Sequence, residues 1–215
     1  MKIEIISVSA MSEGEEVSLT VKISDGEGRE QRKKFLIFSE QYLKLKIGKG
    51  SVIDEETFDK LEVLSKLCRA MKKGSELLSY SPSSKRRLTK RLCEKGLDRE
   101  SAEDAAYRLE KLGLIDEDSD VACAVQSCLK KLWGRTRIYQ TLISKGYEHQ
   151  YVSQHVGDID KKTFIKNCIA LIQKKYKGVP KEPDERKKMV ASLMRYGYSY
   201  SEIKVACDFI LKSNK

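Results

Sequence analysis

A short phrase that occurs three times, Leu-x-x-x-Gly-Φ-x-x-x-x-Φ with Φ apolar, is the feature that most constrains the fold. Its glycines, Gly96, Gly146 and Gly197, are 50 and 51 residues apart. These distances lie at the upper edge of the periods of repeat architectures. The copies consist of Leu92, Gly96, Leu97 and Ala102; of Leu142, Gly146, Tyr147 and Val152; and of Leu193, Gly197, Tyr198 and Ile203.

Each part of the phrase has a structural role. Glycine ends a helix because it adopts the left-handed conformation without a steric cost. The apolar residue after it folds back onto the leucine of the finished helix, and it also pairs with the last residue of the phrase as the hydrophobic staple of the next helix. One residue therefore sets two helix ends. The phrase predicts three copies of one helix–turn–helix elbow, which favours tandem repeats over a bundle with coincidental glycines.

The first 60 residues predict a small antiparallel β meander. A first strand is expected around Ile3–Val8 with a bulge at Ile6, and a second where Val17–Ile23 alternates with polar residues. The run 25–28, Asp-Gly-Glu-Gly, predicts a turn, and a third strand covers 35–38. Three strands alone are marginally stable, so we expect them to pack on the helices that follow.

The helical part is expected to begin near Asp54, with Gly74 interrupting this first helix before 77–80. The first repeat is then expected to start with Ser81 as cap and Pro82 at the first helical position. The buried face of the first helix is expected to carry Phe58, Leu61, Leu64 and Leu67.

These patterns predict a mainly α protein of tandem three-helix repeats that form an elongated curved body, preceded by a small N-terminal antiparallel β region. The expected divisions are a β-rich domain at 1–60, a connecting helix at 61–80, and repeats at 81–133, 134–178 and 179–215. The last repeat is expected to have two helices, after a linker at 178–183.

The net charge of +10 lies entirely on the repeats. Residues 1–80 carry 14 basic and 14 acidic side chains, whereas 81–215 carry 28 and 18. We therefore expect the repeat surface to contact an anionic partner. The chain has no run of 18 apolar residues and its start lacks the apolar region of a signal peptide, so we expect a cytoplasmic protein with no membrane contact.

No reactive constellation is recognisable, and we expect no catalytic residue, cofactor, metal or small-molecule substrate. The acidic run 116–120 lacks the glycine and glutamate of a calcium loop, so it is expected to cap a helix. Residues 48–51 lack the Walker A spacing, and His149 and His155 have no partner by motif. The six cysteines lack the paired spacing of a zinc site, and core cysteine is favoured, because Cys93, Cys128, Cys168 and Cys207 fall at apolar positions of helical patterns.

Basic side chains cluster in every repeat. The cluster at 85–91 is the strongest candidate for partner binding because it lies near a helix N-terminus, where the helix dipole disfavours cations. Trp133 is expected to pack between repeats rather than stack on bases, and solvated helix surface is the plain alternative for any single cation. The candidates are Lys85, Arg86, Arg87, Lys90, Arg91, Lys130, Lys131, Arg135, Arg137, Lys174, Lys175, Arg186, Lys187, Lys188 and Arg195.

From about residue 80 to 212 the chain resembles the RecX family of regulatory proteins. The resemblance is carried by Leu-x-x-x-Gly in each repeat, by the run 112–118 (Leu-Gly-Leu-Ile-Asp-Glu-Asp), by 134–138 leading to 142–147, and by 195–198 (Arg-Tyr-Gly-Tyr). The order and spacing of these motifs are more specific than any one of them. A departure is Glu148, a poor residue to cap the second helix of repeat two.

The resemblance implies a non-enzymatic modulator of the RecA recombinase, acting in DNA repair, recombination and the SOS response. Family members bind RecA and its filament on single-stranded DNA, usually limiting ATPase and strand exchange, and consist of tandem three-helix repeats. For this chain the resemblance implies RecA and the RecA–single-stranded DNA filament as partners, with weak direct DNA contact and a monomeric state.

Two other classes stay open. A module that binds nucleic acid directly through phosphate contacts is the main alternative. Base readout is disfavoured because the helix 99–112 carries Arg99, Arg108 and Lys111 against four acids, while the cations lie on first helices. A general protein-interaction scaffold is the weaker alternative.

Overall fold

The computed structural model describes residues 2–11, 15–25 and 29–213. It divides into two compact units. Unit 1 comprises Met1–Ser81 and Leu88–Ile115, and unit 2 comprises Pro82–Arg87 and Asp116–Lys215.

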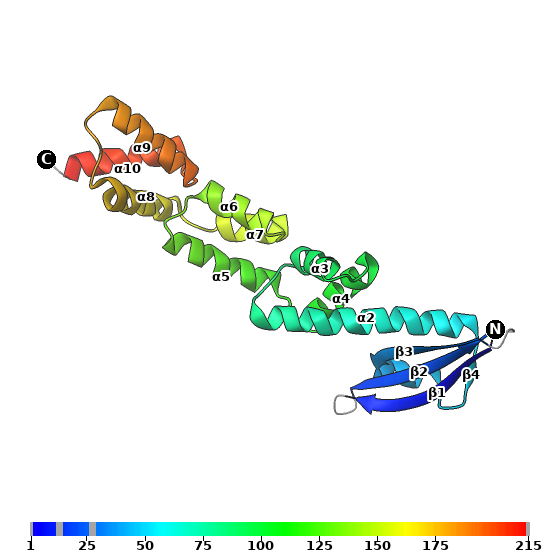
Figure 1. The fold of residues 1–215 in the computed structure, drawn as a ribbon. Helices are drawn as coiled ribbons and strands as arrows, with labels where there is room; N and C mark the ends of the chain where they lie inside the picture. Colours follow the sequence, from blue (N-terminus) through cyan, green and yellow to red (C-terminus); the bar gives the residue numbers. More distant parts are fainter. Residues whose placement is uncertain (1, 12–14, 26–28, 214–215) are drawn as a thin grey trace. The chain divides into compact units, whose positions relative to one another are not determined.

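Unit 1 begins with a four-stranded antiparallel sheet (Figure 1) of order β3-β2-β1-β4. The register of β1 on β2 shifts between Ile5 and Ser7, which confirms the bulge predicted at Ile6. Part of the expected turn, Gly26–Gly28, lies outside the described residues. β4 was not predicted, because two residues are too short for a periodic pattern. The strands are β1 (Lys2–Met11), β2 (Glu16–Ser24), β3 (Glu30–Phe38) and β4 (Val52–Ile53).

After α1 (Ser39–Leu45), the long helix α2 (Glu55–Tyr80) connects the sheet to the rest of unit 1. It begins as predicted at Asp54, whose carboxylate accepts a hydrogen bond of 2.8 Å from the amide of Thr57. Figure 1 shows its first half against the sheet and its second half beside α3 and α4. Leu61 lies in the sheet core and Ala70 in the core shared with α3 and α4, so the sheet packs on a helix as expected.

The predicted interruption of α2 at Gly74 was wrong, because the helix continues through Gly74 to Tyr80. A Cβ built on Gly74 would lie 2.5 Å from Cδ1 of Leu109 in α4 (Arg99–Lys111). This glycine therefore allows two helices to approach closely, which a local pattern does not distinguish from a helix break.

The predicted start of the first repeat was also wrong. Helix α3 spans Lys85–Glu94, and Ser81 and Pro82 precede it. The hydroxyl of Ser84 accepts a hydrogen bond of 3.2 Å from the amide of Arg87, so Ser84 is the cap.

The three elbows adopt one backbone shape, as predicted. Gly96, Gly146 and Gly197 have φ of +85°, +87° and +93°. In each elbow the amide of the residue after the glycine donates to the carbonyl of the leucine in the finished helix, over 3.2, 3.3 and 3.3 Å. This is the bond of a Schellman motif. The pairs are Leu97 with Leu92, Tyr147 with Leu142, and Tyr198 with Leu193.

Unit 2 is helical and has one continuous core that runs from Val121 to Ile210. Asp116 caps its first helix and Ser199 with Glu202 forms the predicted capping box, the amide of Ser199 donating to Glu202 over 2.8 Å. The helices are α5 (Glu117–Lys130), α6 (Arg135–Ser144), α7 (His149–Gly157), α8 (Lys161–Tyr176), α9 (Pro183–Arg195) and α10 (Tyr200–Ser213).

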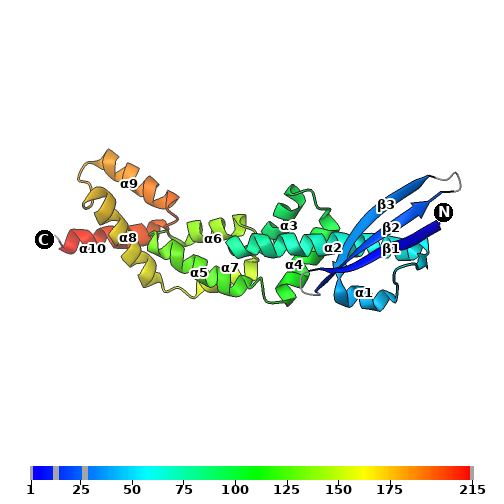
Figure 2. The same ribbon diagram turned by 60° about the horizontal axis from the view of Figure 1, so that its bottom comes forward.

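The helices pack in groups of three. α2 packs on α4, α5 on α6 and α7, and α8 on α10, which also contacts α9 (Figure 2). We therefore propose α2–α4, α5–α7 and α8–α10 as the repeating groups. Each group begins one helix earlier than in the division at 81–133, 134–178 and 179–215.

Four of the cysteines are buried: Cys68, Cys128, Cys168 and Cys207. Burial raises the pKa of the Cys68 thiol to about 11, with a further contribution from the charge of Glu16, and raises that of Cys168 to about 12. These residues are core side chains, as predicted, whereas Cys123 is exposed and Cys93 is half-buried.

Candidate functional site

Two joints of unit 2 are built by the same contact, in which an elbow lies on the N-terminus of an earlier helix. In the first joint the hydroxyl of Ser84 donates to the carbonyl of Lys145 over 2.9 Å. In the second the amide of Gly134 donates to the carbonyl of Tyr196 over 2.7 Å. Lys145 and Tyr196 each directly precede an elbow glycine. Each of these two elbows therefore ends one helix and also contacts the N-terminus of another.

A buried carboxylate completes the first joint. Glu117 is 4 % exposed, and its two oxygens accept from the amides of Lys85 over 2.8 Å and of Glu148 over 3.1 Å. One side chain thus serves the starts of α3 and α7. It compensates for Glu148, which caps α7 without a side-chain hydrogen bond of its own.

Several predicted partner-binding cations are engaged inside the fold. The ammonium group of Lys85 pairs with Glu148 over 2.9 Å. Arg135 donates to the carbonyls of Val156 over 2.6 Å and Ile159 over 2.9 Å. These bonds satisfy one carbonyl in the last turn of α7 and one just beyond its end, and they use both terminal nitrogens of the guanidinium.

A second group of cations stacks on aromatic rings at the joint between α6 and the third elbow. The guanidinium of Arg137 lies 4.3 Å from the ring centre of Trp133 and 5.1 Å from that of Tyr196. Lys175 approaches Tyr196 at 5.4 Å, and Lys131 approaches Trp133 at 5.5 Å. Arg137 thus links a ring before α6 to a ring of the third elbow, in agreement with the packing role expected of Trp133.

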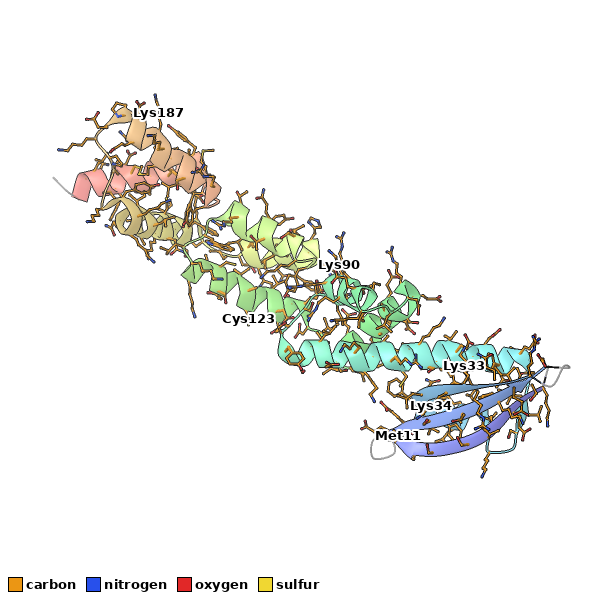
Figure 3. The ribbon with its side chains drawn as sticks, in the orientation of Figure 1. Met11, Lys33, Lys34, Lys90, Cys123 and Lys187 are labelled. Atoms are coloured by element: carbon orange, nitrogen blue, oxygen red, sulfur yellow. The ribbon has the colours of Figure 1, made fainter. Side chains whose placement is uncertain are left out.

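Most of the other candidates face solvent. Lys90 approaches Glu94 at 3.9 Å and Lys187 approaches Asp184 at 3.4 Å, exposed contacts that contribute little stability. Figure 3 shows Lys187 on α9 and Lys90 on α3. Arg91, by contrast, is half-buried. Within the described residues, no ion pair engages the exposed Arg86, Arg87, Lys130, Lys174, Arg186, Lys188 and Arg195.

One basic cluster was missed by sequence reasoning. In unit 1, a hollow of about 240 Å³ is lined by Lys33 and Lys34 of β3 and by Lys66 and Arg69 of α2. The ammonium group of Lys33 pairs with Glu62. The balanced charge of residues 1–80 hides this cluster, because the sheet and α2 contribute cations that are about 30 residues apart in the sequence.

Neither a metal site nor a membrane span is visible in the described ranges. No group of three or more His, Cys, Asp or Glu side chains could hold a metal ion there. No helix in those ranges is both long and apolar enough to cross a bilayer.

Fold and surface together define a helical-repeat protein with an N-terminal β sheet and a basic exterior. Residues 165–207 match the family model described as "RecX, third three-helix domain". The chain is 27 % identical to regulatory protein RecX of Clostridioides difficile (strain 630) over 179 residues, 81 % of this chain and 84 % of that protein. It is 25 % identical to regulatory protein RecX of Chlorobaculum tepidum over 144 residues, 66 % of this chain and 88 % of that protein.

Solved structures show the same fold. A crystal structure of regulatory protein RecX superposes with a TM-score of 0.75 at 20 % identity, covering 96 % of this chain and 99 % of that one. The crystal structure of RecX from Lactobacillus salivarius gives 0.60 at 16 % identity, covering 67 % and 96 %. Sequence and fold agree: over most of its length the chain is similar to regulatory proteins named RecX. This similarity supports a regulatory role.

Proposed function

We propose that this chain binds the RecA recombinase, and its filament on single-stranded DNA, and limits the ATPase and strand-exchange activities of the filament. The proposal is supported by the similarity to regulatory proteins named RecX together with the three matching elbows. It places the protein in the regulation of DNA repair and recombination and in the cytoplasm.

The repeated joint suits a periodic partner. Tandem helical groups present separate surfaces at successive positions of the chain, so separate weak contacts with successive RecA protomers add through effective concentration. A protein that bridges protomers opposes filament growth and the protomer movements that accompany ATP turnover.

The exposed cations provide the electrostatic part of the proposal. Arg186 and Lys188 of α9 and Lys174 of α8 project from unit 2 with no ion pair in the described part of the chain. A nucleoprotein filament is anionic, so these side chains favour approach and weak binding. We leave Arg135 and Arg137 out of this role, because their guanidinium groups are engaged within unit 2.

The test is the rate of RecA ATP hydrolysis on single-stranded DNA, with increasing amounts of this protein. We expect a saturable fall in rate. An unchanged rate, combined with no binding to RecA-coated DNA, would refute the proposal.

Direct binding to nucleic acid is the second candidate, and the same unengaged cations of α8 and α9 favour it. Binding to bare single- and double-stranded DNA over a salt series separates the two. Tight, steeply salt-dependent binding that gains nothing from RecA would support phosphate contact as the main activity.

A further inference from the structure

Within the described residues, the first elbow has the backbone of the other two but no occupant. A Cβ built on Gly96 would meet nothing within 4 Å, whereas one on Gly146 would lie 2.9 Å from the Ser84 hydroxyl and one on Gly197 2.4 Å from the amide of Arg137. In the described residues, no hydrogen bond reaches the carbonyl of Lys95, the residue before Gly96. The elbow of unit 1 is therefore open, whereas each of the two equivalent elbows in unit 2 contacts the N-terminus of a helix.

The two joints of unit 2 indicate which kind of element the elbow at Gly96 accepts. The carbonyl of Lys145 receives the hydroxyl of Ser84, and that of Tyr196 receives the amide of Gly134. Both donors are the caps of helices, of α3 and α6 respectively. A fitting occupant is therefore a helix N-terminus with a small residue at the cap position.

The residue at the cap position must be small because the two backbones approach closely. A Cβ on Gly134 would lie 2.3 Å from the carbonyl carbon of Gly197. The electrostatics are also favourable, since an elbow presents carbonyls at the negative end of one helix to the positive end of another.

The remaining helix that leads into an elbow, α9, does not meet these requirements. Ser84 and Gly134 each lie twelve residues before an elbow glycine, and the equivalent position before Gly197 is Glu185. Helix α9 already begins at Pro183, so Glu185 lies inside its first turn and carries a long side chain. Helix α9 of a second copy is therefore a poor occupant. In α10, which is capped by Ser199, the serine hydroxyl is already paired with that of Ser201 over 3.0 Å, and we take the occupant from the partner of the proposed function.

We propose that the elbow Lys95–Leu97 is a docking surface for a helix N-terminus capped by serine or glycine, and that a RecA protomer in the filament supplies this helix. The inference rests on the proposed function and adds to it the contact surface on this chain and the kind of element that it accepts.

The test compares Gly96→Asn with Gly113→Asn. Asparagine tolerates positive φ, and both glycines have it, +85° and +74°, with open space around the Cβ position. Both substitutions therefore add a side chain at little cost to folding, but only the first places it on the proposed surface. We expect Gly96→Asn to weaken binding to RecA-coated single-stranded DNA by about tenfold or more, and Gly113→Asn to leave binding unchanged.

Hydrogen exchange of the unmodified protein is an independent test of the proposed elbow contact. It tests the contact even if Gly96→Asn fails to fold. Peptides covering 93–98 should exchange more slowly when RecA-coated DNA is bound. If the unmodified protein does not bind RecA-coated DNA, the proposed function fails. If it binds but both variants bind alike, or 93–98 show no protection, the elbow inference fails and the proposed function stands.

Discussion

Gly134 and Gly197 meet backbone to backbone: the amide of Gly134 donates to the residue before Gly197, and a Cβ on Gly134 would lie 2.3 Å from the Gly197 carbonyl carbon. Positive φ explains the glycine at 197, but not the one at 134, whose φ of −81° suits any residue. Gly134 is required by the neighbour rather than by its own conformation.

Gly134→Ala should therefore destabilise the protein. The added methyl group forces the joint apart, at a cost of about 1–3 kcal/mol. The matched control is Gly157→Ala, where a Cβ meets nothing within 4 Å, and which should not destabilise. Urea unfolding checks both, and equal stabilities of the two variants would contradict the close approach.

Arg135→Ala should also destabilise the fold, because the carbonyls of Val156 and Ile159 lose a charged donor. Hydrogen bonds to charged groups contribute about 1.5–3 kcal/mol each, so the loss of both is expected to cost about 3–6 kcal/mol. Lys174→Ala, an exposed control, should change stability by less than about 0.5 kcal/mol. Thermal unfolding distinguishes this outcome from a role of Arg135 in binding alone, which would leave stability intact.

Reversing the charge of Arg186 and Lys188 to glutamate should weaken inhibition of the RecA ATPase, by about threefold to tenfold at low salt, because both side chains are exposed. Arg32→Glu with Lys49→Glu, exposed in unit 1, makes the same change in net charge and should have little effect. If both pairs act alike, net charge rather than the α9 surface is responsible.

Alkylation at pH 7.5 should modify Cys123 first and Cys93 more slowly. Cys68 and Cys168 should resist until unfolding, since burial raises their pKa values to about 11 and about 12 and so keeps the thiols protonated. Mass spectrometry of partially labelled protein reports the order, and Cys123→Ser should remove the fast phase. Rapid labelling of Cys168 in the folded state would contradict its burial in the core.

Asp98 should contribute a pH-dependent part of the stability. Its pKa is lowered chiefly by the hydrogen bond from the amide of Ser101, with burial opposing. A lowered pKa means that the stabilisation is present above the unfolded-state value, about 3.9, and is lost as pH falls through the folded-state value. Asp98→Asn caps equally well without titrating, so the stability of the two proteins should diverge below about pH 4 in acid titrations. Parallel curves would show that the cap carries no charge dependence.

Local elements were predictable because their causes are local. The elbow at Gly96 depends on residues five apart, and the Asp54 and Ser199 caps on residues three apart. The bulge at Ile6 followed from a break in alternation within one strand.

Predictions from local sequence failed where a residue distant in the sequence determines the local structure. Gly74 resembles a helix break and instead makes room for Leu109, 35 residues later. The expected start at Ser81 was displaced to Ser84, whose hydroxyl also reaches the carbonyl of Lys145. The carboxylate of Glu117 resembled a helix-capping acid but serves Lys85 and Glu148 of other elements.

The sequence by itself determined three identical elbows, the strands before them and a surplus of positive charge on the repeats, because each is set by near neighbours or by composition. Only the tertiary structure decided which cations are available. Arg135 and Arg186 look alike in the sequence, but Arg135 lies where unsatisfied carbonyls of another helix need its guanidinium, whereas Arg186 lies on an exposed helix face. The availability of a charge depends on what folding brings beside it.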